Sequence, residues 1–162
     1  MMKSYLNKIV LLLLGGAMSC QAGLSQLEAL SMIESGDNDQ AIGGAGEVSR
    51  YQIKPSVWRR YTRSRTYQDS ALAAVVAQQY LAALDTIFTR RTGHTPTDFD
   101  RYVMWNAGPG YYERIGFEPR RVYPVVRRRA LRYVNLREMS NAAATLEKSL
   151  VTVPLFAAQQ VR

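Results

Sequence analysis

Cysteine and histidine are almost absent from this chain of 162 residues, which contains one of each, Cys20 and His94. A single cysteine excludes a disulfide within the chain, and a single histidine leaves too few ligands for catalytic zinc. Mechanisms that pair a serine or cysteine nucleophile with histidine lose their base, because His94 lies in the turn-forming segment RTGHTP. A carboxylate is therefore the strongest candidate for acid–base chemistry, and we expect no metal and no organic cofactor.

Phosphate-binding patterns are missing as well. No G-x-x-x-x-G-K-[ST] loop is present, and the glycines around Ala45 do not follow a predicted strand. Glycoside cleavage is the reaction class that most often depends on carboxylates alone, so it becomes the first class to consider.

The only long apolar run stands at the N-terminus, where MMKSYLNK is followed by IVLLLLGGAM and SCQAG. This layout predicts an export signal over residues 1–22, since the run is too short for a permanent anchor. Cys20 allows a second interpretation as a lipoprotein signal, although Ala17 stands where such sites usually carry leucine. Both interpretations place the protein outside the cytoplasm, in the periplasm or cell envelope, and the second adds a lipid anchor. The prediction leaves a domain over residues 23–136 and a weakly amphipathic extension over residues 137–162.

The formal net charge is +8, and it favours acidic partners. For an exported protein these are anionic lipid headgroups or cell-wall polymers rather than nucleic acid. A dense group of arginines follows Pro119, and its default interpretation is a solvated helix face. The group comprises arginines 120, 121, 127, 128, 129, 132 and 137.

Apolar spacing, caps and helix breakers predict a mainly α (α+β) domain with one small β-hairpin. The hairpin is expected in EVSRYQI, residues 47–53. The expected helices cover residues 24–35, residues 55–61, residues 70 to about 91 after the cap Asp69, residues 95–106, and residues 119 to about 136.

Glu34 ends the first of these helices, directly after Met32 and Ile33. Partial burial and the negative end of the helix dipole would both favour its protonated form there. A carboxyl group that stays neutral can protonate a leaving sugar oxygen. Judged by position alone, Glu34 is more often an ordinary solvated glutamate at a helix end. The surrounding motifs have to decide between that interpretation and a catalytic role.

Three segments in order supply those motifs: ESG at 34–36, GEVSRYQI at 46–53 and WNAGPG at 105–110. Together they resemble the soluble-type lytic transglycosylase domain of the lysozyme-like superfamily, over residues 24–136. The resemblance implies a lysozyme-like fold, in which a helical domain carries a small β-hairpin beside the active-site cleft.

The resemblance also implies roles for individual residues. Glu34 matches the single catalytic acid/base and is followed by the motif serine, Ser35. Gln52 matches the glutamine that lines the sugar cleft, and Tyr51 takes the place of a methionine. The remaining substrate-binding positions implied are Trp105, Asn106, Ala107, Gly108 and Tyr123, the last resembling a tyrosine that hydrogen-bonds the catalytic glutamate.

Three further residues depart from the family pattern. Ser49 and Arg50 stand where Gly-Leu is usual, which predicts a looser hairpin and a more basic cleft. Glu47 is a potential second carboxylate that could position water and turn a transglycosylase into a hydrolase. An equally open interpretation makes Glu47 a surface residue paired with Arg50.

We therefore expect a monomeric, exported enzyme that cuts the β-1,4 bond between N-acetylmuramic acid and N-acetylglucosamine in peptidoglycan. The resemblance implies that Glu34 acts first as acid and then as base, which leaves 1,6-anhydromuramic ends. Membrane-surface contact through the basic helix or a lipidated Cys20 is a further expectation. Two alternatives stay open: a lysozyme or chitinase-type hydrolase that uses Glu47, and a non-enzymatic wall-binding module.

Overall fold

The computed structural model describes residues 24–151, so the predicted export signal and Cys20 lie outside the described residues. Within them the chain is mainly helical, and this part of the fold-class prediction is confirmed. The elements are α1 (Gln26–Ser35), α2 (Pro55–Trp58), α3 (Ser70–Thr92), α4 (Asp98–Ala107), α5 (Pro109–Arg114), the 3₁₀ helix η1 (Pro119–Arg121) and α6 (Pro124–Val151).

Capping residues set the ends of α1, α3 and α4, which explains why the bounds of these helices fall close to the predicted ones. Ser25 and Glu28 form a reciprocal capping box at the start of α1, and Thr97 and Asp100 form another at the start of α4. Gly36 ends α1 in the left-handed conformation, with φ of 66°. The carboxylate of Asp69 accepts from the Leu72 amide at the start of α3, as predicted.

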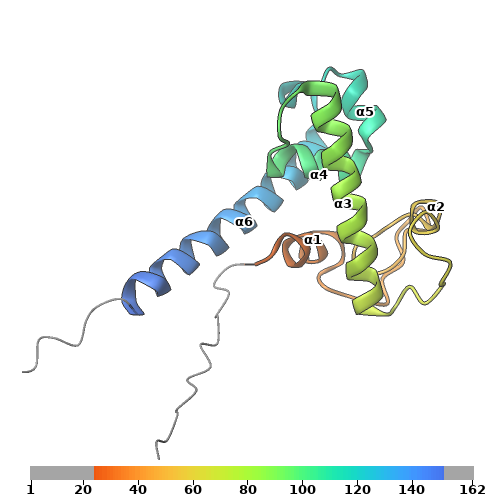
Figure 1. Ribbon diagram of the computed structural model, residues 1–162, viewed down its shortest axis with the longest axis horizontal. Helices are drawn as coiled ribbons and strands as arrows, with labels where there is room; N and C mark the ends of the chain where they lie inside the picture. The colour runs from red at the N-terminus through yellow and green to blue at the C-terminus, as the bar shows by residue number, and fades with distance from the viewer. Residues whose placement is uncertain (1–23, 152–162) are drawn as a thin grey trace, which may run out of the picture.

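Helix α4 lies at the centre of the molecule and packs against α3, α5 and α6 (Figure 1). The rings of Tyr102 in α4 and Tyr133 in α6 stack with their centroids 5.3 Å apart. Burial of such large rings is the main source of stability in a domain of this size. The largest fully buried side chains include Trp58, Tyr102, Tyr112, Tyr133, Leu30, Ile53 and Leu84.

The predicted β-hairpin does not form as two strands in the described part of the chain. Val48 instead makes two isolated antiparallel bridges, one with Ile42 and one with Ile53. The amides of Val48 and Ile53 each donate to the other residue's carbonyl at 2.9 Å. Ser49 and Gln52 both have positive φ, 66° and 52°, so the chain turns back at once and pairing stops after a single bridge.

The C-terminal half differs from the prediction in three places. Pro119 begins a short 3₁₀ turn, and the long helix α6 starts at Pro124, where a missing amide hydrogen costs nothing. Helix α6 passes the predicted boundary at residue 136 without a break and extends away from the body (Figure 1). The short helix α5 after NAG was not predicted at all.

By length and composition α3 is also apolar enough to cross a membrane, and among the described helices it is the one that meets this test. Core helices of soluble proteins meet the same test. One third of its apolar window is buried inside the domain. The buried residues of α3 are Ala73, Val76, Ala77, Leu81, Leu84 and Phe88.

Candidate functional site

A cleft with a volume of about 330 Å³ opens between the end of α1, the loop that follows it, the end of α4 and one side of α6. We call it the Glu34 cleft. It is lined by Glu34, Gly43, Glu47, Gln52, Lys54, Tyr80, Trp105, Asn106, Ala107, Gly108 and Arg129, among others. Segments that are far apart in the sequence therefore meet around one carboxyl group.

Seven of the ten predicted site residues line this cleft: Glu34, Glu47, Gln52, Trp105, Asn106, Ala107 and Gly108. Trp105 is only 8 % exposed, and its indole nitrogen donates to the Tyr51 carbonyl at 3.3 Å. It therefore shows the cleft only part of its ring rather than an open aromatic face.

The other three predicted residues lie elsewhere. The side chain of Tyr51 is only 4 % exposed and packs in the hydrophobic core. The Ser35 hydroxyl donates to the Arg50 carbonyl at 2.8 Å and ties α1 to the loop. Tyr123 is 63 % exposed, and its ring packs against Tyr111 with centroids 5.1 Å apart, outside the Glu34 cleft. The expected contact between Tyr123 and Glu34 is therefore wrong.

Glu34 is held in the last turn of α1, which the Gly36 cap terminates. Its Oε1 atom is buried and has no hydrogen-bond partner within residues 24–151. Burial raises the pKa of Glu34, while the Tyr102 hydroxyl and the Arg129 charge lower it, and the Glu47 charge raises it further. The net effect is a pKa above the ordinary value, which favours the protonated acid.

Tyr102 takes the place beside Glu34 that was predicted for Tyr123. Its hydroxyl group is buried, stands close to the Glu34 carboxyl and Arg129, and has no partner at hydrogen-bond geometry among the described residues. Burial and the nearby Glu34 charge both raise the pKa of Tyr102, so the phenol stays protonated. Helical spacing could have identified it, because Tyr102 lies one turn before Asn106 on the same face of α4.

Gly43 allows Glu47 and Gln52 to come together. A β-carbon built on Gly43 would lie 2.4 Å from Glu47 Oε2 and 2.5 Å from Gln52 Oε1, which is too close for either side chain. Glu47 Oε2 accepts from the Ala45 amide at 3.0 Å, and Gln52 Nε2 donates to the Ser49 carbonyl at 3.1 Å. Both side chains are thus oriented by the loop backbone at the cleft wall.

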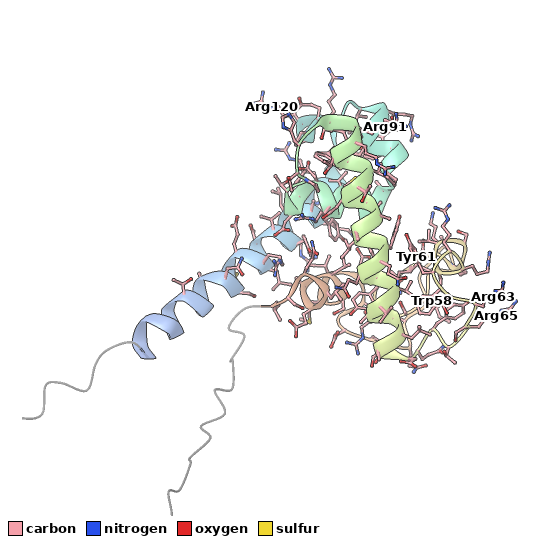
Figure 2. The ribbon with its side chains drawn as sticks, in the orientation of Figure 1. Trp58, Tyr61, Arg63, Arg65, Arg91 and Arg120 are labelled. Atoms are coloured by element: carbon pink, nitrogen blue, oxygen red, sulfur yellow. The ribbon has the colours of Figure 1, made fainter. Side chains whose placement is uncertain are left out.

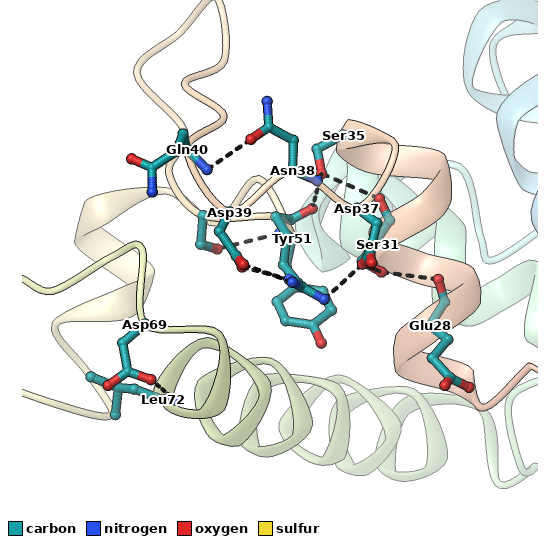
Figure 3. A network of polar contacts seen from close by, with 12 residues as sticks. Glu28, Ser31, Ser35, Asp37, Asn38, Asp39, Gln40, Tyr51, Asp69 and Leu72 are labelled. Atoms are coloured by element: carbon teal, nitrogen blue, oxygen red, sulfur yellow. Dashed lines mark hydrogen bonds and ion pairs between the residues drawn. The ribbon is translucent and has the colours of Figure 1, made fainter.

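Arg50 does not line the Glu34 cleft. It belongs instead to a polar network in which Figure 3 labels Ser31, Asp37 and Asp39. Its guanidinium group donates to both carboxylate oxygens of Asp39, at 2.6 and 2.7 Å, and to Asp37 at 2.7 Å. Asp37 also accepts from the Ser31 hydroxyl at 2.7 Å. The suggested pair between Glu47 and Arg50 is therefore wrong, and the cations of the cleft are Lys54 and Arg129 rather than Arg50.

No group of three or more histidine, cysteine, aspartate or glutamate side chains is arranged to hold a metal ion within residues 24–151. Two carboxyl groups, those of Glu34 and Glu47, line the Glu34 cleft. Comparison with protein-family models, with curated proteins and with solved structures yields no match to this chain.

Proposed function

We propose that this protein is a lysozyme-like lytic transglycosylase that cleaves the β-1,4 bond between N-acetylmuramic acid and N-acetylglucosamine in peptidoglycan. One observation carries the proposal: the buried Oε1 of Glu34 has no partner in the described structure and belongs to a side chain that lines the cleft. A buried carboxyl oxygen without a hydrogen-bond partner is costly to the fold, and such costs are typical of functional sites.

In this mechanism the protonated carboxyl of Glu34 donates its proton to the glycosidic oxygen as the bond to the anomeric carbon breaks. The N-acetyl group of the same muramic acid residue assists at that carbon. The C6 hydroxyl then forms the new bond to the anomeric carbon, and its proton returns to Glu34. The products are a free 4-hydroxyl on one sugar and a 1,6-anhydro ring on the other, and Glu34 is protonated again.

The neighbouring residues have supporting roles in this proposal. Gln52 and Asn106 offer amide groups to sugar hydroxyl and N-acetyl groups at the cleft wall. Tyr102 and Arg129 adjust the acidity of Glu34 and stabilise its ionised form while the proton is on the sugar. Export to the cell envelope, as a monomer, belongs to the same proposal, because peptidoglycan is found there.

A second candidate is hydrolysis, and the position of Glu47 favours it. Glu47 lines the same cleft as Glu34, and its charge raises the pKa of Glu34. A substrate bound in the cleft would therefore lie near both carboxyl groups. A second carboxylate beside the acid can activate water, as in inverting glycosidases. In that case water would take the place of the C6 hydroxyl, and the products would carry reducing ends.

Digestion of purified peptidoglycan, followed by mass analysis of the fragments, tests both candidates. We expect anhydro ends from the wild-type protein and almost no fragments from the Glu34→Gln variant. Reducing ends that disappear in Glu47→Gln would show hydrolysis instead. Equal release by wild type and Glu34→Gln would refute any role of Glu34 in cleavage, and wall binding without release by either would indicate a non-enzymatic binding module.

A further inference from the structure

A second surface, separate from the Glu34 cleft, lies over η1 and the first turns of α6. It surrounds a shallow groove, and Figure 2 marks one of its arginines, Arg120, at one end of the molecule. We call it the arginine patch. It comprises Arg120, Arg121, Tyr123, Arg127, Arg128 and Leu131.

Helical geometry places this patch on the outer side of α6. Val126, Ala130 and Tyr133 form the buried side of the helix. At about 100° per residue, Arg127, Arg128 and Leu131 point away from that buried side. None of them contributes to the core, so the fold alone gives no reason for their residue types.

The four arginines of the patch have no acidic partner in the described part of the chain. The ion pairs found there involve Arg50, Arg91, Arg101 and Arg137 instead. Like charges gathered on one surface repel one another, and an anionic partner would relieve that repulsion.

Apolar side chains are exposed between these charges. Tyr123 is 63 % exposed and Leu131 is 45 % exposed within the same patch. An acidic polysaccharide or a nucleic acid backbone would use the arginines but would gain little from leucine. A bilayer uses both, because arginine binds the phosphate groups while tyrosine and leucine enter the boundary of the acyl chains.

We propose that the arginine patch docks the protein onto an anionic phospholipid surface. The lipid phosphates pair with Arg120, Arg121, Arg127 and Arg128, and the side chains of Tyr123 and Leu131 enter the interface. This inference goes beyond the proposed cleavage reaction and does not depend on it.

The position of the patch also orients the cleft. Arg129 lines the Glu34 cleft, whereas Arg127, Arg128 and Leu131 lie about 100–160° around α6 from it. A membrane bound at the patch therefore leaves the cleft open and turned away from the lipid. Such an orientation suits an enzyme whose polymeric substrate lies above a membrane.

Co-sedimentation of the full chain with vesicles tests the proposal. The vesicles are phosphatidylcholine with about 30 % phosphatidylglycerol, or phosphatidylcholine alone, at low and high salt. The measured quantity is the excess binding to the anionic vesicles. Because Lys3 and Lys8 of the N-terminal segment also attract anionic lipid, the patch is judged by the loss of this excess relative to a variant of equal net charge. We expect this excess to be large at low salt and to fall at high salt.

Two quadruple variants with the same change in net charge sharpen the test. Arginines 120, 121, 127 and 128 are changed to glutamine in the first variant, and arginines 59, 60, 63 and 65 in the matched control. Figure 2 labels Arg63 and Arg65 of the control set, which lie far from Arg120. We expect the patch variant to lose the excess binding by roughly 100-fold and the control to lose only a few-fold.

Three results would overturn the proposal. Equal losses in both quadruple variants would show that net charge, not the patch, drives binding. An unchanged excess in the patch variant would exclude the patch. A Tyr123→Ser, Leu131→Ser double variant whose excess binding matches wild type would show that these two side chains do not enter the interface and that the patch binds by charge alone.

Discussion

On the two sides of the loop after α1, the charged groups differ in whether they have hydrogen-bond partners. On one side Arg50 is bound by Asp37 and Asp39, and Asp37 is bound in turn by Ser31. On the other side Glu34 has a buried oxygen atom without a partner among the described residues, and the neighbouring Tyr102 hydroxyl has none either. The first arrangement stabilises the loop, and the second leaves capacity for a ligand at a cost in stability.

This contrast separates residues that build the site from residues that could act in it. The Arg50 network holds the loop against α1, so that Glu47 and Gln52 reach the cleft wall. Glu34 and Tyr102 contribute little to the fold through their polar atoms. Substitutions on the two sides should therefore affect stability and activity differently.

The largest effect is expected for Glu34→Gln. Removing the acid should lower the cleavage rate by about 10³-fold or more. The same change should raise the Tm at neutral pH, because burial raises the pKa of Glu34 and the ionised carboxylate destabilises the native state. Thermal unfolding across a pH series and peptidoglycan turnover measure the two effects.

The sign of the pH dependence follows from the raised pKa. Below the pKa of the unfolded chain Glu34 is protonated in both states, and the wild type and Glu34→Gln should have similar Tm values. As the pH rises through the folded pKa, only the wild type loses stability. The exposed control Glu138→Gln should show no such divergence. A Tm of Glu34→Gln below that of wild type at neutral pH would contradict the argument.

Gly43→Ala should have the next largest effect. The new β-carbon would clash with Glu47 Oε2 and Gln52 Oε1, so the polar ends of both side chains must shift from their places at the cleft wall. We expect roughly 10–100-fold slower cleavage with little change in Tm, since displaced cleft residues impair positioning rather than the core. Gly44→Ala is the matched control, because a β-carbon on Gly44 would meet nothing within 4 Å. Equal cleavage rates for the two variants would show that the close approach of Glu47 and Gln52 to Gly43 does not determine activity.

Arg50→Gln should affect stability more than activity. It removes the contacts to Asp37 and Asp39 and leaves both acids without their cation. Because these side chains are partly exposed, solvent screening limits the loss to about 1–2 kcal/mol of unfolding free energy. Urea denaturation measures it against Arg59→Gln, an exposed arginine with no described ion pair. A loss no greater than in that control would mean that the network does not hold the loop.

The smallest effect is expected for Tyr102→Phe. The hydroxyl lowers the pKa of Glu34, so its removal should raise that pKa and move the alkaline limb of the pH–rate profile to higher pH. The rate at the optimum should fall only a few-fold. Tyr133→Phe, in the ring stacked on Tyr102, is the control and should leave the profile in place. If Tyr102→Phe had the same pH–rate profile as wild type, the Tyr102 hydroxyl would have no effect on the pKa of Glu34.

Much of the secondary structure was predictable because its signals are local. Asp69 and Gly36 cap helices through their own backbone and side-chain geometry, and these contacts need no distant residue. The hairpin was overestimated because alternation in EVSRYQI does not show that Ser49 and Gln52 have positive φ. The end of the basic helix was misplaced because α6 continues with helix-forming residues past the predicted boundary.

The features of the candidate site also fall into two groups, those set by residues close in the chain and those set by tertiary packing. The sequence by itself determined a mainly helical chain, a glutamate at the end of α1, and a glycine-rich loop followed by Gln52, since each depends on residues close in the chain. Only the tertiary structure decided that Tyr102 and Arg129 stand beside Glu34, that Tyr123 lies outside the cleft, and that Arg50 pairs with Asp37 and Asp39. The physical reason is that burial and charge at Glu34 come from α4 and α6, which packing brings against α1 from far along the chain.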